Sequence, residues 1–198
     1  MKNINIQLPD WRRIDWKSPI NTISIISLLG ALLYLIYPEI IFHGGIRNHH
    51  ANIFRFIEEM ILYSFLHGGI LHVFSNIVFF IFIGRIIENT HGQKWTWHLW
   101  IWTTVFVGLF LALFSESRTI GWSGFAMSLL AVYAYDLHKQ QRRSDYKWAI
   151  LLILINLIIG GSASVSFLGH FAGLIAGIIY SWYRQRFSHF SHIFSRKN

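Results

Sequence analysis

A serine in a glycine-rich stretch is the first feature of this sequence that could do chemistry. Ser123 lies in the four residues Gly-Trp-Ser-Gly that end at Gly124, where the polar residues 115–119 give way to the apolar run 125–135. Glycine lets another part of the chain approach closely, which suits a nucleophile that must be reached. A seryl hydroxyl is a poor nucleophile until a base takes its proton. On its own, the stretch fits a small-residue contact between helices better than a site.

His170 is a candidate for that base, because the imidazole pKa lies near neutral pH. It belongs to a stretch with glycine at positions 169, 173 and 177, so one face of the predicted helix is nearly bare. Such a face lets another helix pack closely. If that helix carries Ser123, the imidazole comes within reach of the hydroxyl. The alternative is a packing seam with a buried histidine and no chemistry.

His72 and Asn76 form a third candidate group. They are four residues apart, so they share one face of a helix. Their N–H groups could stabilise the oxyanion of a tetrahedral intermediate, which is often the largest catalytic effect. His72 could instead be the base, and a polar pair that bridges two helices is the alternative without chemistry. No carboxylate is placed to complete a triad, because Asp136 and Glu88 fall near the ends of their predicted helices that lie away from Ser123. A serine–histidine dyad is therefore the simpler hypothesis.

The composition predicts that membrane-spanning helices position these residues. Of the 198 residues, 54% are hydrophobic and 13% are charged, whereas about 25% of the residues of a soluble domain are charged. Six apolar runs cover residues 20–37, 70–87, 97–114, 122–135, 148–159 and 165–183. Most are long enough to cross a hydrocarbon core of about 30 Å, and the fourth and fifth are short for a bilayer. We therefore expect an all-α, polytopic membrane protein with six transmembrane helices.

The connecting segments add three expectations. Within the loop 38–69, apolar residues recur at helical spacing and predict an amphipathic helix at the membrane interface; these residues are Phe54, Ile57, Ile61, Phe65 and Leu66. Residues 1–19 form a polar tail without a cleavable signal peptide, and residues 184–198 form a basic tail. The chain has no cysteine, which excludes disulfides and thiolate chemistry.

The cations predict the orientation. If the N-terminus is cytoplasmic, all but three of the 17 lysines and arginines (Arg47, Arg55 and Arg118) fall on the cytoplasmic side, which the positive-inside rule favours. The formal net charge of +8 has the same origin, because the cations form no stripe that would indicate nucleic-acid binding. The second, fourth and sixth runs then cross from outside to inside. All the candidate residues thus lie at a similar depth near the outer boundary, where unpaired polar groups tend to mark function.

Four motifs in this order and spacing resemble the rhomboid family of intramembrane serine proteases, and the resemblance extends from Leu66 to Gly177. The motifs are His67-Gly68-Gly69 followed by His72-xxx-Asn76, Gly84-xxx-Glu88-xxx-Gly92, Gly121-Trp122-Ser123-Gly124, and Gly169-His170-xx-Gly173-xxx-Gly177. The resemblance implies a six-helix, rhomboid-like membrane domain over residues 20–183, flanked by the two tails.

The resemblance also implies roles. Ser123 would be the nucleophile and His170 the general base, with oxyanion donors from His72, Asn76 and the Ser123 backbone N–H. The supporting positions would be Gly121, Gly124, Met127, Gly173 and His67. Members of the family cleave transmembrane protein substrates near the outer membrane boundary, so the partners expected are such substrates and membrane lipid, with no nucleic acid, metal or cofactor. A short chain of this form suggests a bacterial inner membrane, with both termini in the cytoplasm.

Two positions depart from the family pattern. Many members carry Trp-Arg where this chain has Glu58 and Glu59, and the nearest similar pair is Phe54-Arg55. Many members also carry an aromatic residue four positions after the serine, which stacks on the catalytic histidine; here that residue is Met127, whose sulfur can still pack on a ring. Neither change removes a catalytic atom, and both bear on efficiency and substrate choice.

Three other functions fit parts of the sequence. A weakly active or inactive rhomboid-like protein would bind transmembrane helices without cutting them. A zinc protease would use His67, His72 and His170 as ligands, but the His-Glu-xx-His helix and a carboxylate base are missing. A transporter would normally carry inverted repeats and midplane charges, and neither is found in the sequence.

Overall fold

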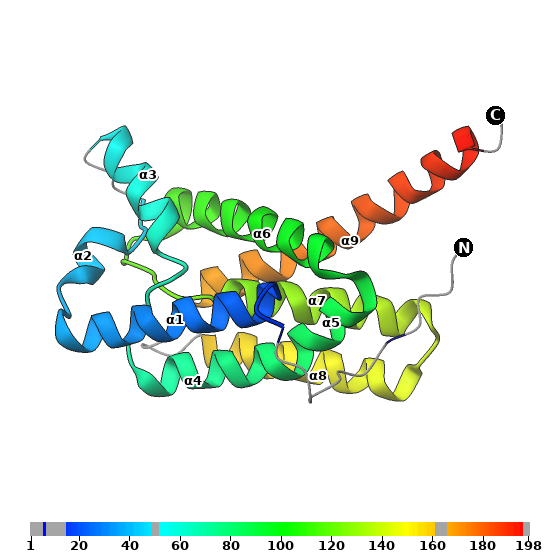
Figure 1. Ribbon diagram of the computed structural model, residues 1–198, viewed down its shortest axis with the longest axis horizontal. Coiled ribbons are helices and arrows are strands. Elements are labelled where there is room, and N and C mark those ends of the chain that lie inside the picture. Colours follow the sequence, from blue (N-terminus) through cyan, green and yellow to red (C-terminus); the bar gives the residue numbers. More distant parts are fainter. Residues whose placement is uncertain (1–5, 7–14, 49–51, 161–165, 196–198) are drawn as a thin grey trace.

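The computed structural model describes residues 6, 15–48, 52–160 and 166–195. Helices make up nearly all of the described chain: α1 (Pro19–Ile36), α2 (Ile40–Gly44), α3 (Ile53–Leu62), α4 (Ile70–Phe79), the π-helical turn η1 (Phe80–Gly84), α5 (Arg85–His91), α6 (Gln93–Phe114), α7 (Ser123–Lys139), α8 (Arg143–Gly160) and α9 (Phe167–Ser195). Within these residues the only β pairing is one antiparallel bridge between Ile46 and Thr119. The all-α class is as predicted (Figure 1).

Among the residues that the structure describes, three helical segments are long and apolar enough to cross a membrane: Pro19–Ile36, the α4–η1–α5 helix Ile70–His91, and Gln93–Phe114. Their outward side chains are large and apolar; Leu71 is 85% exposed and Ile36 is 84% exposed. Such a surface suits lipid, and with the apolar composition it marks an integral membrane protein. The other three predicted spans coincide with α7, α8 and α9, and their crossing of a membrane stays a prediction.

The segment ends differ from the sequence expectations in several places. The amphipathic helix α3 ends at Leu62, so Phe65 and Leu66 lie beyond it, and Leu66 is buried rather than at an interface. The short helix α2 was not predicted. The sixth helix continues to Ser195, so the predicted basic tail begins within a helix. Most of the predicted tail 1–19, and Val165 at the start of the sixth run, lie outside the described residues.

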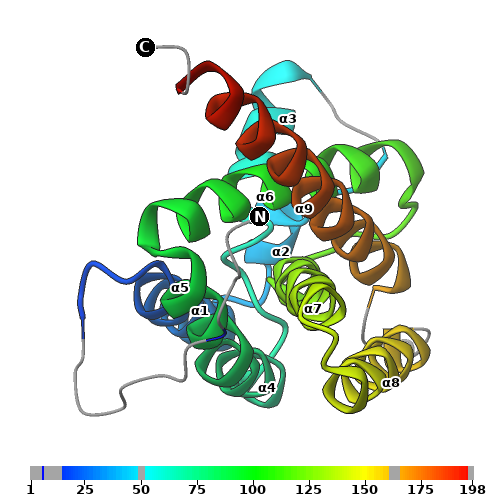
Figure 2. The same cartoon turned by 90° about the vertical axis from the view of Figure 1, so that its right-hand side faces the viewer.

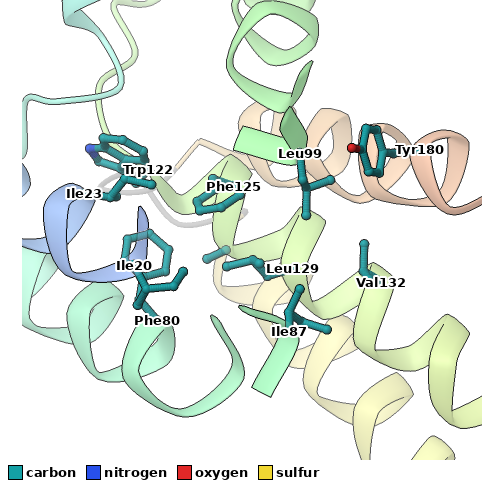
Figure 3. Packing of buried hydrophobic residues seen from close by; sticks show 11 residues of the cluster. Ile20, Ile23, Phe80, Ile87, Leu99, Trp122, Phe125, Leu129, Val132 and Tyr180 are labelled. Carbon is teal, nitrogen blue, oxygen red and sulfur yellow. The ribbon is translucent and has the colours of Figure 1, made fainter. Parts of the chain in front are cut away.

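Helix α7 lies in the middle of the bundle and contacts α4, η1, α5, α6, α8 and α9 (Figure 2). Except in its last two turns, its residues are mostly apolar or small on every face, which is the pattern of a helix surrounded by others. Phe125, Leu129 and Val132 of this helix belong to one buried apolar cluster with Phe80 and Tyr180 (Figure 3). Because α7 begins at Ser123, the packing that holds α7 also fixes the candidate nucleophile.

Helices α7 and α9 approach each other at the glycine seam that the sequence predicts. A Cβ atom built on Gly173 would lie 2.0 Å from the backbone oxygen of Gly124, and one built on Gly177 would lie 2.5 Å from the oxygen of Ser128. Only hydrogen atoms fit in these gaps, so the two backbones are in direct contact. This contact brings the start of α9, with His170, next to the start of α7, with Ser123.

The loop 38–69 is tied to the segment before α7. Ile46 and Thr119 exchange two backbone hydrogen bonds, of 3.0 and 2.8 Å. Arg118 donates to the carboxylate of Glu59 at 3.3 Å and to the carbonyl of Gly45 at 3.0 Å. Glu59 is one of the two acidic residues at the position of the family's Trp-Arg pair, and its side chain is buried. This departure from the family pattern therefore has a structural counterpart, an ion pair with the loop that leads to Ser123.

Candidate active site

Ser123 is the first residue of α7, and the turn before it is held in place by Trp122 and Gly121. The Trp122 ring is fully buried, stacked on Trp100 at 5.6 Å and edge-on to Phe65 at 5.2 Å between ring centroids. Gly121 has φ +114, a left-handed conformation that favours glycine. Its N–H donates to the carbonyl of Tyr63 at 2.7 Å. At the start of a helix the first N–H groups have no carbonyl partner within the helix, so the backbone around Ser123 offers free donors.

His170 lies in the first turn of α9, and its ring is oriented by a backbone group of another helix. Nδ1 of the imidazole is 2.8 Å from the carbonyl oxygen of Asn156 in α8. A carbonyl can only accept, so Nδ1 carries the proton and the neutral ring has its lone pair on Nε2. That Nε2 atom is buried and has no hydrogen-bond partner. The tautomer is thus the one that a general base requires, with the basic nitrogen free.

His72 and Asn76 lie on α4, and Asn76 is oriented by His67. The Asn76 amide Nδ2 donates to His67 Nε2 at 3.1 Å. Burial lowers the pKa of His67 from 6.5 to about 3, so that ring is neutral and can accept this bond at physiological pH. The His67 and His72 rings meet edge to face, 5.2 Å apart. His72 Nε2 is buried without a partner, and a Cβ atom at Gly121 would lie 3.1 Å from this ring, so glycine at 121 leaves room for the imidazole.

One cavity of about 220 Å³ brings these residues together. Its lining consists of His72, Ser75, Asn76, Phe79, Ser123, Ala126, Met127, Asn156, Ile159 and His170. The four residues proposed for chemistry and Met127 thus share one space, although they come from three helices. Ser123 and His170 do not form a hydrogen bond in this structure, because His170 Nε2 has no partner. Such bonds are often long or absent before substrate binds and form only in the complex.

Two features of the site were missed from the sequence. Asn156 was not singled out, although it is the one polar residue in the apolar run 149–159, and that isolation was the available signal. The bond between His67 and Asn76 was also missed. These residues are nine apart and on different segments, so no helical periodicity relates them.

The zinc alternative does not fit the geometry. In the part of the chain that the structure describes, no group of three or more histidine, aspartate and glutamate side chains is arranged to hold a metal ion. The carboxylates lie elsewhere, as expected: Asp136 accepts from His91 at 2.7 Å, and Glu88 accepts from Ser18 at 2.7 Å. Both pairs tie helices together at the end of the bundle opposite to Ser123.

Comparison with known families identifies the fold. A sequence profile of the rhomboid domain matches residues 52–187, which is more than half of the chain and includes every residue of the cavity. This chain belongs to the rhomboid family. The predicted resemblance is thereby confirmed, and the family's intramembrane character agrees with the apolar helices.

Two curated rhomboid relatives are similar to the chain. Rhomboid-type serine protease 2 of Saccharomyces cerevisiae is 28% identical over 137 residues, which cover 61% of this chain and 51% of the relative. Rhomboid-like protease 1 of Toxoplasma gondii is 24% identical over 183 residues, which cover 83% of this chain and 58% of the relative. The chain thus spans about half the length of these relatives. Both come from eukaryotes, so they do not support the predicted bacterial origin.

Proposed function

We propose that this rhomboid-family protein is an intramembrane serine endopeptidase that cleaves transmembrane protein substrates near the outer membrane boundary. The observation that carries the proposal is the single cavity that contains Ser123, His170, His72 and Asn76. The tautomer of His170, with Nδ1 bonded to a carbonyl and Nε2 free, is the second support. The protease names of the two relatives agree with this function.

The reaction would run as a serine–histidine dyad. His170 Nε2 takes the proton of the Ser123 hydroxyl as Oγ attacks the scissile carbonyl carbon, and the imidazolium then gives that proton to the leaving amine. Donors from His72, Asn76 and the Ser123 backbone N–H stabilise the oxyanion of the tetrahedral intermediate. Water then hydrolyses the acyl-enzyme with His170 again as base. A water molecule takes about 30 Å³ in the liquid, so a cavity of about 220 Å³ has room for several.

Substrates would enter the cavity between α4 and α8. These two helices flank it without a close backbone approach: both lie wholly within the described residues, and no Cα atom of one comes within 8 Å of a Cα atom of the other. Figure 2 shows them as neighbours on one side of α7. A substrate helix must lose local backbone hydrogen bonds before a peptide bond reaches Ser123, which favours substrates with helix-breaking residues.

The test is labelling of the purified protein in detergent with a fluorophosphonate probe. The wild type is expected to label, and Ser123→Ala and His170→Ala are expected to abolish labelling. Ser75→Ala is the matched control, because Ser75 lines the same cavity but its hydroxyl donates to the carbonyl of His72 at 2.8 Å. Labelling that survives in Ser123→Ala would assign the reactive group elsewhere and overturn the proposal.

Binding of transmembrane helices without cleavage is the second candidate, and the departures from the family pattern at Glu58, Glu59 and Met127 favour it. A panel of transmembrane substrates distinguishes the two. Cleavage that depends on Ser123 supports the protease. If the folded wild type neither labels nor cleaves any member of the panel, the binding function replaces it.

A further inference from the structure

The carbonyl that orients His170 belongs to helix α8, which carries none of the predicted catalytic residues. Asn156 lies in α8, in a run that is otherwise apolar from Ala149 to Ile159. Its main-chain oxygen accepts from His170 Nδ1 at 2.8 Å, and its side-chain amide donates back to the carbonyl of Leu152 at 2.8 Å. Within the described residues, the His170 ring thus has one hydrogen bond, which links α9 to α8, since Nε2 has no partner.

Helix α8 is held on one side only. It packs against α7 and α9, and no Cα atom of α8 lies within 8 Å of a Cα atom of α4 across the cavity. Several of its outward side chains are apolar and largely exposed, such as Ile158 at 77%. A helix with one packed side and one side toward lipid can move with less loss of contact than α7, which is surrounded. The orientation of His170 thus depends on the position of the less tightly held helix beside the substrate path.

We propose that Asn156 is a positioning residue whose main-chain carbonyl fixes the tautomer and orientation of His170, so that the base is competent only while α8 lies against α9. The inference rests on the proposed protease function. When α8 moves away, Nδ1 loses its acceptor, the ring can turn, and the tautomer with the proton on Nε2 becomes accessible. That tautomer cannot take the proton of Ser123.

The arrangement has a consequence for substrate choice. A segment that enters between α4 and α8 and holds α8 away from α9 is bound but not cut. A segment that unwinds and lets α8 return is cut, because His170 is oriented again. Substrates are then distinguished partly by whether α8 can close behind them.

The test replaces the peptide bond after Asn156 by an ester. Incorporation of the α-hydroxy acid of leucine at Leu157, by nonsense suppression, turns the Asn156 carbonyl into an ester carbonyl, which is a weaker acceptor. The matched control is the same change at Leu154, which removes an equivalent N–H from α8 and weakens the carbonyl of Ile153 instead. We expect the rate of fluorophosphonate labelling to fall at least about tenfold at Leu157, because one buried hydrogen bond is weakened. The control should stay within about twofold of the wild type.

A second readout is the ¹⁵N spectrum of protein labelled in its histidines. The signals of His170 are those missing from His170→Ala. In the wild type and the Leu154 ester they should be those of a ring protonated at Nδ1, and in the Leu157 ester those of a mixture of tautomers. A substitution that only lowers the stability of the fold would not change the ¹⁵N chemical shifts of His170.

Three outcomes are distinct. Slower labelling and mixed tautomers in the Leu157 ester alone support the proposal. Equal labelling rates and unchanged tautomers in both esters overturn it, as does an equal loss in both. A wild type that does not label, and does not cleave any substrate of the panel, contradicts the proposed protease function itself.

Discussion

Gly173 has no room for a side chain, and the close packing of α9 on α7 at this residue sets the position of His170. A Cβ atom at this position would lie 2.0 Å from the Gly124 oxygen, whereas one at Gly169, on the same helix, would have its nearest neighbour at 3.4 Å. Gly173→Ala must therefore push α9 away from α7, at a cost of about 3 kcal/mol or more. We expect its Tm in detergent to fall by about 6 °C or more and its labelling by the probe to be lost. Gly169→Ala should change the Tm by less than about 2 °C; equal effects of the two would show that the seam is not the cause.

His67 gives a pH dependence whose sign follows from burial. Its pKa is lowered from 6.5 to about 3, so between these values the unfolded chain binds a proton that the folded chain does not. The free energy of unfolding therefore falls as the pH falls through this window, by up to about 1.4 kcal/mol per pH unit, and the contribution is constant above it. His67→Gln keeps an acceptor for Asn76 and does not titrate.

The measurement is the difference in unfolding free energy between the wild type and His67→Gln from about pH 7 to about pH 4.5. The unfolding free energy of the wild type should fall relative to that of His67→Gln as the solution becomes more acidic. Parallel curves for the two proteins would mean that His67 does not contribute to the acid sensitivity.

At the level of single residues, the sequence indicated the candidate site residues better than the groups that support them. Ser123, His170, His72 and Asn76 were found because side-chain chemistry and helical spacing both mark them, and one cavity contains them. Asn156 could not be found in this way, since it acts through its main chain and every residue has a carbonyl. The partner of Glu59 could not be found either, because Arg118 lies in a distant loop and the pairing depends on how two loops meet.

Between elements, the ion pair of Glu59 and Arg118 ties the loop 38–69 to the segment that leads to α7. Both side chains are largely buried, with 3% and 19% of their surface exposed. Removing one partner of a buried pair costs about 3 kcal/mol or more, whereas removing both costs less than the sum. We expect Glu59→Gln and Arg118→Gln each to lower the Tm in detergent and the double variant to lower it by less than the two together. Additive losses would mean that the two charges do not stabilise each other.

The gap between α4 and α8 predicts a second effect between elements. Phe79→Cys and Ile159→Cys place a thiol on either side of the cavity, in a chain that has no other cysteine. A disulfide needs Cα atoms within about 7 Å, and the helices are farther apart, so a bifunctional thiol reagent is required. The bridge should reduce cleavage of transmembrane substrates by more than about tenfold, while the small probe still labels Ser123.

Each single-cysteine variant treated with the same reagent is the control for that bridge. Full cleavage by the bridged protein would mean that substrates enter by another route.

For the whole molecule, the positive-inside rule predicts which loops face the cytoplasm. Ser117, before α7, and Ser144, at the start of α8, are both exposed and lie on opposite sides in the proposed orientation. In right-side-out membranes an impermeant thiol reagent should label Ser117→Cys at once and Ser144→Cys only after the membrane is opened. The reverse order would invert the orientation and place the cavity on the cytoplasmic side.

The helices were predictable as a whole because long apolar runs leave few other folds in a membrane. The residues at which individual helices begin and end were less predictable. The end of α3 at Leu62 and the burial of Leu66 depend on how the loop folds back onto the bundle. The π-helical turn from Phe80 to Gly84 has no signature in an apolar run.

The hydrogen bond between His170 and the Asn156 carbonyl has a consequence for which mutations this protein can tolerate as it evolves. The atom that helix α8 contributes is the same whatever side chain is attached, so mutations along α8 can alter its lipid-facing and substrate-facing surfaces without changing the group that orients the base. Helix α7 has less freedom, since most of its side chains are buried. If the proposed function holds, inherited variation in substrate preference is therefore expected to accumulate on α8, next to a proposed reaction centre that stays constant.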